Sequence, residues 1–338
     1  MHNSSDRARR QTGADDSTPA FTRLADLASA RTGGRAIETN DDFFAPKSNL
    51  VKPAAPVFIP GKYTTRGKWM DGWESRRRRT PGHDWCVVRL GMRGRVRGVD
   101  VDTSFFTGNF PSHCSLEARD TATRTAWTTI LPHCELRGDS HNYFVVTDER
   151  SWTHLRLNIF PDGGVARLRV YGEVVVDWAR VARGREAVDL AVIEHGGLVL
   201  GASDVHYGAP GNMLMPGRAA NMGDGWETKR RRGPGYDWAI VRLGAPGELT
   251  KIEIDTNHFK GNYPDSASIE GCFAPAANFD SLHAATWFEM LPQTKLKADH
   301  RHLFARELRH RGAVSHVRLN IFPDGGVSRF RVHGRLAR

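Results

Sequence analysis

The feature of this 338-residue chain that most limits its fold is a long internal duplication. Residues 71–111 align without gaps with residues 224–264, and 22 of the 41 aligned pairs are identical. A second pair of segments, 154–172 and 316–334, is identical at 15 of 19 positions. Spacings of this size belong to whole domains and far exceed the roughly 20–50 residues of a solenoid repeat. The chain is therefore predicted to consist of two homologous domains in tandem, residues 21–172 and 189–338.

The segments outside the two copies are predicted to be a lead-in and a linker. Residues 1–20 are polar and lack the apolar core of a signal peptide, so we expect a disordered lead-in. Residues 173–188 join the copies and end in polar side chains. The alignment also requires about ten extra residues between positions 53 and 71 of the first copy. Insertions of this kind are typical of surface loops.

Within each copy the apolar residues alternate with a period of two, which predicts strands. In the first copy the pattern covers residues 85–90, 96–102, 115–118, 142–146, 154–159 and 165–171. Glycine- and proline-containing stretches between them, such as 91–94 and 131–133, are predicted to be turns. Helical pattern is confined to short pieces such as 21–30. These features predict an all-β chain of two tandem antiparallel jelly-roll sandwiches, of the galactose-binding-like type.

Composition narrows the class of protein further. The four cysteines show no CxxC pair and no framework spacing, so a disulfide scaffold or a structural zinc site is not expected and a reducing cytoplasm fits. No apolar run reaches the roughly 20 residues of a membrane helix. The net charge of +10 favours anionic ligands, but it does not distinguish nucleic acid from a small carboxylate.

The candidate functional residues are polar side chains that recur in the loops of both copies. The acidic candidates for catalysis are Glu74, Asp102, Glu227 and Asp255. The candidates for substrate binding are Arg76, Arg77, Arg78, Thr103, Asn109, Arg230, Arg231 and Asn262. Arginine can bind a carboxylate through two parallel hydrogen bonds, whereas an aspartate or glutamate in a cleft can act as an acid or base.

Each of these candidates also has a purely structural interpretation. A run of arginines is usually a solvated basic loop, and carboxylates at a strand end often cap turns or pair with nearby arginines. The histidines are scattered, and no metal-ligand spacing or nucleotide-binding motif is present, so neither a metal nor a cofactor is predicted. The sequence leaves open which copy holds the working site, or whether the site lies between copies.

Several long motifs together resemble the allantoicase (allantoate amidinohydrolase) family. They are DGWESRRRR/DGWETKRRR, GHDWCVVRLG/GYDWAIVRLG, VDVDTSFFTGNFP/IEIDTNHFKGNYP and LNIFPDGGVARLRVYG, and they cover both copies. The resemblance implies a hydrolase of purine (allantoin) degradation that converts allantoate and water to ureidoglycolate and urea. It further suggests that arginines from 76–79 bind the carboxylate of allantoate, while Glu74, Asp102 and Asn109 bind or polarise its ureido arms.

Two other classes of function remain as alternatives. Jelly rolls often bind sugars without catalysis through aromatic side chains at loop tips, and the two DGW tryptophans would suit that role. Nucleic-acid binding has only the positive charge in its favour. The expected partner is a small-molecule substrate, with neither nucleic acid nor membrane, and the strand edges of a sandwich favour a homo-oligomer. The expected location is the cytoplasm.

Overall fold

The computed structural model describes residues 18–123, 125–309 and 312–337. Contacts divide the chain into two compact units, which we call the N-terminal repeat (residues 18–175) and the C-terminal repeat (residues 176–337). Most of the expected lead-in, residues 1–17, lies outside the described residues. Ala20 already belongs to a short 3₁₀ helix, η2 (Ala20–Arg23).

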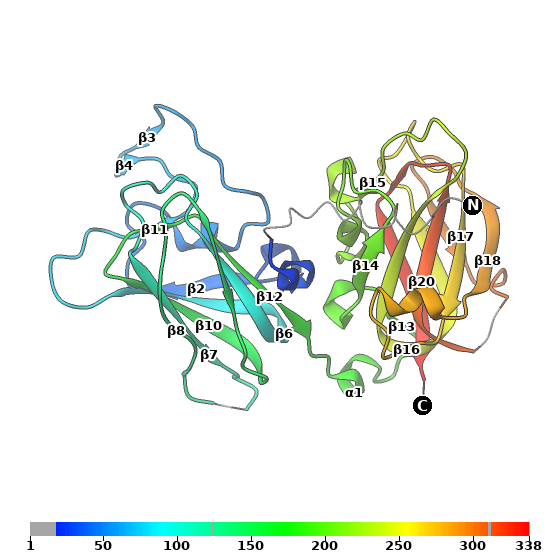
Figure 1. The fold of residues 1–338 in the computed structure, drawn as a ribbon, viewed down its shortest axis with the longest axis horizontal. Coiled ribbons are helices and arrows are strands. Elements are labelled where there is room, and N and C mark those ends of the chain that lie inside the picture. Colours follow the sequence, from blue (N-terminus) through cyan, green and yellow to red (C-terminus); the bar gives the residue numbers. More distant parts are fainter. Residues whose placement is uncertain (1–17, 124, 310–311, 338) are drawn as a thin grey trace, which may run out of the picture. The chain divides into compact units, whose positions relative to one another are not determined.

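The N-terminal repeat is built on one eight-stranded antiparallel sheet. Its strands are β1 (Ala25–Asp26), β2 (Arg35–Thr39), β6 (Asp84–Asp102), β7 (His113–Arg119), β8 (Thr128–Glu135), β9 (His141–Val145), β10 (Ser151–Phe160) and β12 (Arg167–Val174) (Figure 1). The small pairs β5 (Trp73–Glu74) with β11 (Gly164–Val165) and β3 (Tyr63–Thr64) with β4 (Gly67–Lys68) lie beside it. Short 3₁₀ helices η3 (Ala30–Thr32) and η4 (Lys47–Val51) complete the repeat.

The long strand β6 joins the two layers of the sandwich. Its first half, residues 84–89, pairs with β10 and, through part of its length, with β2, whereas residues 98–102 pair with β12 and β9. The predicted turn at 91–94 is wrong, because the strand continues through these residues. A Cβ on Gly91 would lie 2.4 Å from the Thr32 carbonyl oxygen, so this glycine serves a close backbone approach.

Alternating side chains of the strands fill the space between the layers. Leu155, Leu157 and Ile159 of β10 are fully buried, and the residues between them face the other side of the sheet. The predicted turn at 131–133 is also wrong, since these residues lie within β8. Proline at position 132 is compatible with this position because β8 ends the sheet and has a strand on one side only.

The C-terminal repeat has the same strand order. Its large sheet contains β13 (Val188–Asp189), β14 (Leu198–Ala202), β16 (Asp237–Asp255), β17 (Ser266–Cys272), β18 (Phe288–Lys295), β19 (Arg301–Phe304), β20 (Ala313–Phe322) and β22 (Arg329–Leu336). A small sheet pairs β15 (Trp226–Glu227) with β21 (Gly326–Val327). The helices are α1 (Trp178–Val181), η5 (Ile193–His195), η6 (Pro210–Leu214), η7 (Met222–Asp224) and η8 (Ser281–Ala284). The predicted fold class, two tandem all-β sandwiches, is confirmed.

Gly164, the first residue of β11, is expected to be essential for packing in the N-terminal repeat. A Cβ on Gly164 would lie 1.9 Å from the ring of Phe106, which is almost fully buried. Gly164→Ala should therefore lower the free energy of unfolding by roughly 1–3 kcal/mol, as overpacked cores do. Gly108→Ala is the matched control, because nothing lies within 4 Å of its added Cβ. Denaturant unfolding that ranks the two variants equally would contradict this account.

Candidate functional site

Three loops meet at one end of each sandwich. In the N-terminal repeat, the Ser75 amide donates to the Gly163 carbonyl at 3.1 Å and the Arg78 amide to Asp162 Oδ2 at 2.8 Å. The Gly164 amide donates to the Asn109 carbonyl at 2.8 Å. These bonds fix the loop that follows β5 against the loops before β7 and before β11. The C-terminal repeat makes the same three bonds at the aligned residues.

A glutamate and an asparagine are paired at this end in both repeats. Asn109 Nδ2 donates to Glu74 Oε1 at 2.7 Å, and Asn262 Nδ2 donates to Glu227 Oε1. Burial raises the pKa of the Glu74 carboxyl above its ordinary value, while the Asn109 hydrogen bond and the charge of Lys68 oppose that rise. The structure thus brings together two residues that the sequence predicted for catalysis and binding.

Each glutamate–asparagine pair lines a hollow. The N-terminal hollow has a volume of about 370 Å³, and its wall includes Lys68, Met70 and Phe105 besides the pair. The C-terminal hollow has a volume of about 510 Å³. Its wall includes the pair and also Tyr207, Arg230, Arg231, Asp265 and Asp324. Both volumes suit a small polar molecule.

The candidate arginines fall into two groups. Arg78 lies 3.0 Å from buried Asp84, and Arg231 makes the equivalent ion pair with buried Asp237, so these guanidiniums anchor their own loops. Arg76 is exposed and pairs with Asp41 at 2.7 Å.

Arg77 and Arg230 occupy aligned positions and are both exposed. Neither guanidinium has a hydrogen-bond or ion-pair partner among the residues that the structure describes. Of the two, Arg230 lines a hollow.

Among the described residues, no hydrogen bond joins the strand-end residues Asp102 and Thr103 to the glutamate–asparagine pair. Asp102 is 2% exposed, and its Oδ1 accepts a hydrogen bond from the Ser104 amide at 2.8 Å. The Thr103 hydroxyl donates to the Arg137 carbonyl at 2.6 Å. Neither residue belongs to the walls of the two hollows that the glutamate–asparagine pairs line. These contacts cap a turn at the end of a strand, which is the structural role expected from sequence as the alternative to catalysis.

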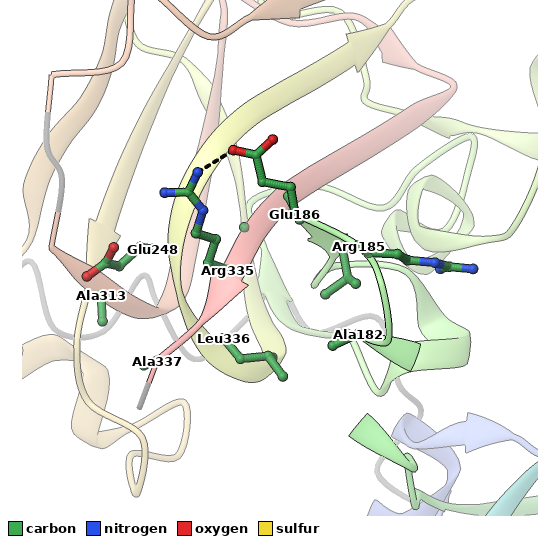
Figure 2. A pocket seen from close by; sticks show the side chains of 11 residues that line it. Ala182, Arg185, Glu186, Glu248, Ala313, Arg335, Leu336 and Ala337 are labelled. Carbon is green, nitrogen blue, oxygen red and sulfur yellow. Dashed lines mark hydrogen bonds and ion pairs between the residues drawn. The ribbon is translucent and has the colours of Figure 1, made fainter. Parts of the chain in front are cut away.

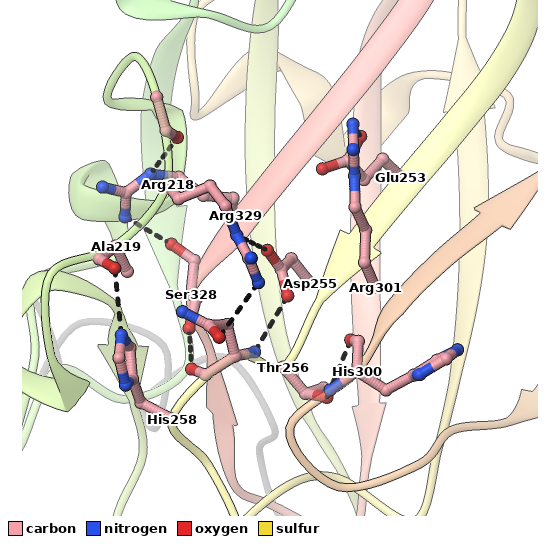
Figure 3. A network of polar contacts seen from close by, with 12 residues as sticks. Arg218, Ala219, Glu253, Asp255, Thr256, His258, His300, Arg301, Ser328 and Arg329 are labelled. Carbon is pink, nitrogen blue, oxygen red and sulfur yellow. Dashed lines mark hydrogen bonds and ion pairs between the residues drawn. The ribbon is translucent and has the colours of Figure 1, made fainter.

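Asp255, the counterpart of Asp102, belongs to a larger polar network in the C-terminal repeat (Figure 3). Its Oδ1 accepts from the Asn257 amide at 2.9 Å, and Arg218 Nε lies 3.9 Å from its Oδ2. His258 Nε2 lies 2.9 Å from the Ala219 carbonyl oxygen. The network fixes the loop around Arg218 to the end of β16, and the N-terminal repeat has no arginine at the aligned position.

A larger hollow lies elsewhere in the C-terminal repeat. It has a volume of about 680 Å³ and is bordered by residues 182–188 and by the end of β22, where Arg335 pairs with Glu186 (Figure 2). None of the predicted site residues lines it. Its size alone therefore does not make it the candidate site.

Sequence reasoning missed two sets of polar residues. Lys68 and Met70 lie between positions 53 and 71, in the segment that contains the ten extra residues and that the sequence marked only as a surface loop. The second set is an arginine–glutamate pair that recurs on the outer sheet faces, Arg156 with Glu117 and Arg318 with Glu270. Along β7 and β10, polar side chains alternate with buried apolar ones, and this pattern could have indicated a polar sheet face.

The described residues contain no group of three or more histidine, cysteine, aspartate or glutamate side chains arranged to hold a metal ion. All four cysteines are free thiols. Among the described helices, none has the length and apolar character needed to cross a membrane.

The fold and its loop-end hollows define a tandem jelly-roll protein with a small polar hollow in each repeat. The family model of the allantoicase repeat matches residues 25–175 and 188–337. The chain therefore belongs to the allantoicase family.

Relatives and a solved structure agree with this assignment. A probable allantoicase 1 from Burkholderia mallei (strain ATCC 23344) is 53% identical over 330 residues, which cover 95% of this chain and 98% of the relative. A probable allantoicase from Pseudomonas paraeruginosa (strain DSM 24068 / PA7) is 52% identical and covers 93% of this chain and 97% of its own. The crystal structure of allantoicase from Saccharomyces cerevisiae superimposes with a TM-score of 0.79 at 35% identity, covering 92% and 93% of the two chains.

Proposed function

We propose that the protein hydrolyses allantoate to ureidoglycolate and urea, as a step of purine degradation. The observation that carries this proposal beyond family membership is the glutamate–asparagine pair, which lines a hollow in both repeats. Allantoate has one carboxylate and two ureido arms. Its recognition requires a cation at the rim and hydrogen-bonding groups inside, and each hollow supplies both.

The glutamate of the pair supports an acid–base mechanism. Its carboxyl proton passes to the nitrogen of one ureido arm, and the bond from that nitrogen to the central carbon breaks to release urea. The lone pair of the remaining ureido nitrogen forms a double bond to the central carbon. Water then adds to that carbon and returns a proton to the carboxylate. Proton transfer by a positioned side chain contributes about 10²–10⁴-fold to a rate.

The first test is the reaction itself. Purified protein incubated with allantoate should release one urea per allantoate consumed. The double variant Glu74→Gln/Glu227→Gln should lose at least about 10²-fold in kcat, because an amide cannot donate the proton. Circular dichroism should show an unchanged fold. Absence of urea release by the native protein would refute the proposed activity.

We propose further that the protein is a cytoplasmic homo-oligomer that does not bind nucleic acid. Free thiols at all four cysteines suit a reducing compartment. Strands β8 and β18 each end a sheet and offer an edge for association. Light scattering of the native protein tests the oligomer. Passage through a DNA column at physiological salt tests the absence of nucleic-acid binding.

A further inference from the structure

The two hollows differ because of the insertion in the N-terminal repeat. The segment with this insertion contains the β3–β4 hairpin, and Lys68 of β4 forms part of the N-terminal wall. The C-terminal repeat is about ten residues shorter at this point, and no residue preceding Asp224 in that segment lines its hollow. In the described part of the C-terminal repeat this segment reaches the pair only through Met222, whose sulfur lies 3.9 Å from Asn262 Nδ2, so the hairpin and its lysine belong to the N-terminal hollow alone.

Lys68 is the cation of the N-terminal wall. Its ammonium group lies 4.6 Å from the centre of the Phe58 ring, and Phe58 stacks on Phe105 at 5.8 Å between ring centres. Phe105 itself lines the hollow. Within the described residues Lys68 has no hydrogen-bond or ion-pair partner, although its charge acts on Glu74. The aromatic pair thus holds a free ammonium at the rim of the hollow.

The C-terminal hollow offers a less suitable set of charges. Its wall holds the carboxylate of Asp324 besides Glu227, whereas the carboxylate of Asp265 in the same wall is paired with Lys295 at 2.7 Å. Arg231 is bound to Asp237, which leaves Arg230 as the unpaired cation of that wall within the described residues. Extra carboxylates beside a binding cation repel an anionic ligand. In the smaller N-terminal hollow, burial raises the pKa of Glu74, which favours the protonated form that an acid catalyst requires.

We propose that the N-terminal hollow is the working site, and that Lys68 is the side chain that binds the substrate carboxylate there. This inference rests on the proposed activity and assigns its place and its anchor. The anchor positions the two ureido arms over Glu74 and Asn109. The C-terminal repeat retains the glutamate–asparagine pair without the hairpin and its lysine.

The anchor is tested by steady-state kinetics on the full-length protein. Lys68→Met should raise KM for allantoate about 10–100-fold with kcat changed less than about 3-fold, because a contact made equally to substrate and transition state affects KM alone. Lys68→Arg should recover most of the affinity. Lys62→Met is the matched control: Lys62 lies in the same segment, but its ammonium contacts the Trp69 ring at 3.8 Å, outside the hollow. Equal KM values for Lys68→Met and native protein would overturn the anchor.

Single substitutions of Glu74 and Glu227 test which of the two hollows is the working site. Glu74→Gln should lose at least about 10²-fold in kcat, and this loss should exceed that of Glu227→Gln by at least about 10-fold. The reverse result, or equal losses in both variants, would overturn the assignment to the N-terminal hollow. Calorimetric titration with allantoate separates this failure from that of the proposed activity. If native protein binds allantoate but releases no urea, the proposed activity is refuted. In that case the binding role of Lys68 is supported only if Lys68→Met binds allantoate more weakly than native protein does.

Discussion

Replacing Arg167 with methionine is expected to destabilise the N-terminal repeat by about 3–5 kcal/mol, because one partner of a buried ion pair is lost. Arg167 is 1% exposed, and its guanidinium lies 2.7 Å from Asp71 Oδ2. The same group also donates to the carbonyl of Asp71 at 2.7 Å and to that of Ala54 at 3.0 Å. Methionine fills similar space but leaves these acceptors without their buried donor. The decrease in the free energy of unfolding is measured by chemical denaturation, with hydrogen exchange in β10 as the probe of the N-terminal repeat.

The chain contains both a control and a replicate for this prediction. Arg150→Met removes an exposed ion pair with Asp148 and should cost no more than about 1 kcal/mol. Arg329 is the counterpart of Arg167 in the C-terminal repeat, where it lies 2.8 Å from Asp224. Arg329→Met should lower protection in β20 and leave β10 unchanged. Equal losses for Arg150→Met and Arg167→Met would show that burial does not determine the cost.

The fold could be predicted from sequence because both of its signals are local or repeated. Alternation of apolar residues gave the strands, and the duplication gave the two units. The turn predicted at 91–94 failed because glycine has two uses: it allows tight turns, and it allows backbones to approach closely. The second use requires knowledge of the opposing segment, here the Thr32 carbonyl. That information is not local in sequence.

The candidate site was predictable only in part, for a related reason. Recurrence in both copies identified Glu74 and Asn109, which the structure pairs. Recurrence also marked Arg78 and Thr103, whose side chains hold loops in place. Repetition thus selects structural and functional residues alike, and it passes over a residue such as Lys68 that only one copy has. Distinguishing these groups requires the contacts of each side chain.

Acidification is expected to destabilise the C-terminal repeat through one buried histidine. His316 is fully buried in β20, and in the described structure its Nε2 has no hydrogen-bond partner. Burial, aided by the charge of Arg242, lowers its pKa to about 4. Below pH ~6.5 the unfolded chain therefore binds a proton that the folded repeat does not. The stability is complete above that pH and decreases progressively as the pH falls towards 4, by about 3 kcal/mol in total.

The substitution that tests this account is His316→Phe, which keeps a ring but removes the titration. The variant should lose less stability than native protein between pH 7 and pH 4.5, as measured by denaturant unfolding with hydrogen exchange in β20. His154→Phe is the matched control, since this aligned histidine is only partly buried and its pKa is lowered less far. Its effect on the pH dependence should be smaller and confined to the N-terminal repeat. If His316→Phe and native protein lose stability in parallel, the acid sensitivity lies in other groups, and the unpartnered Nε2 is not its origin.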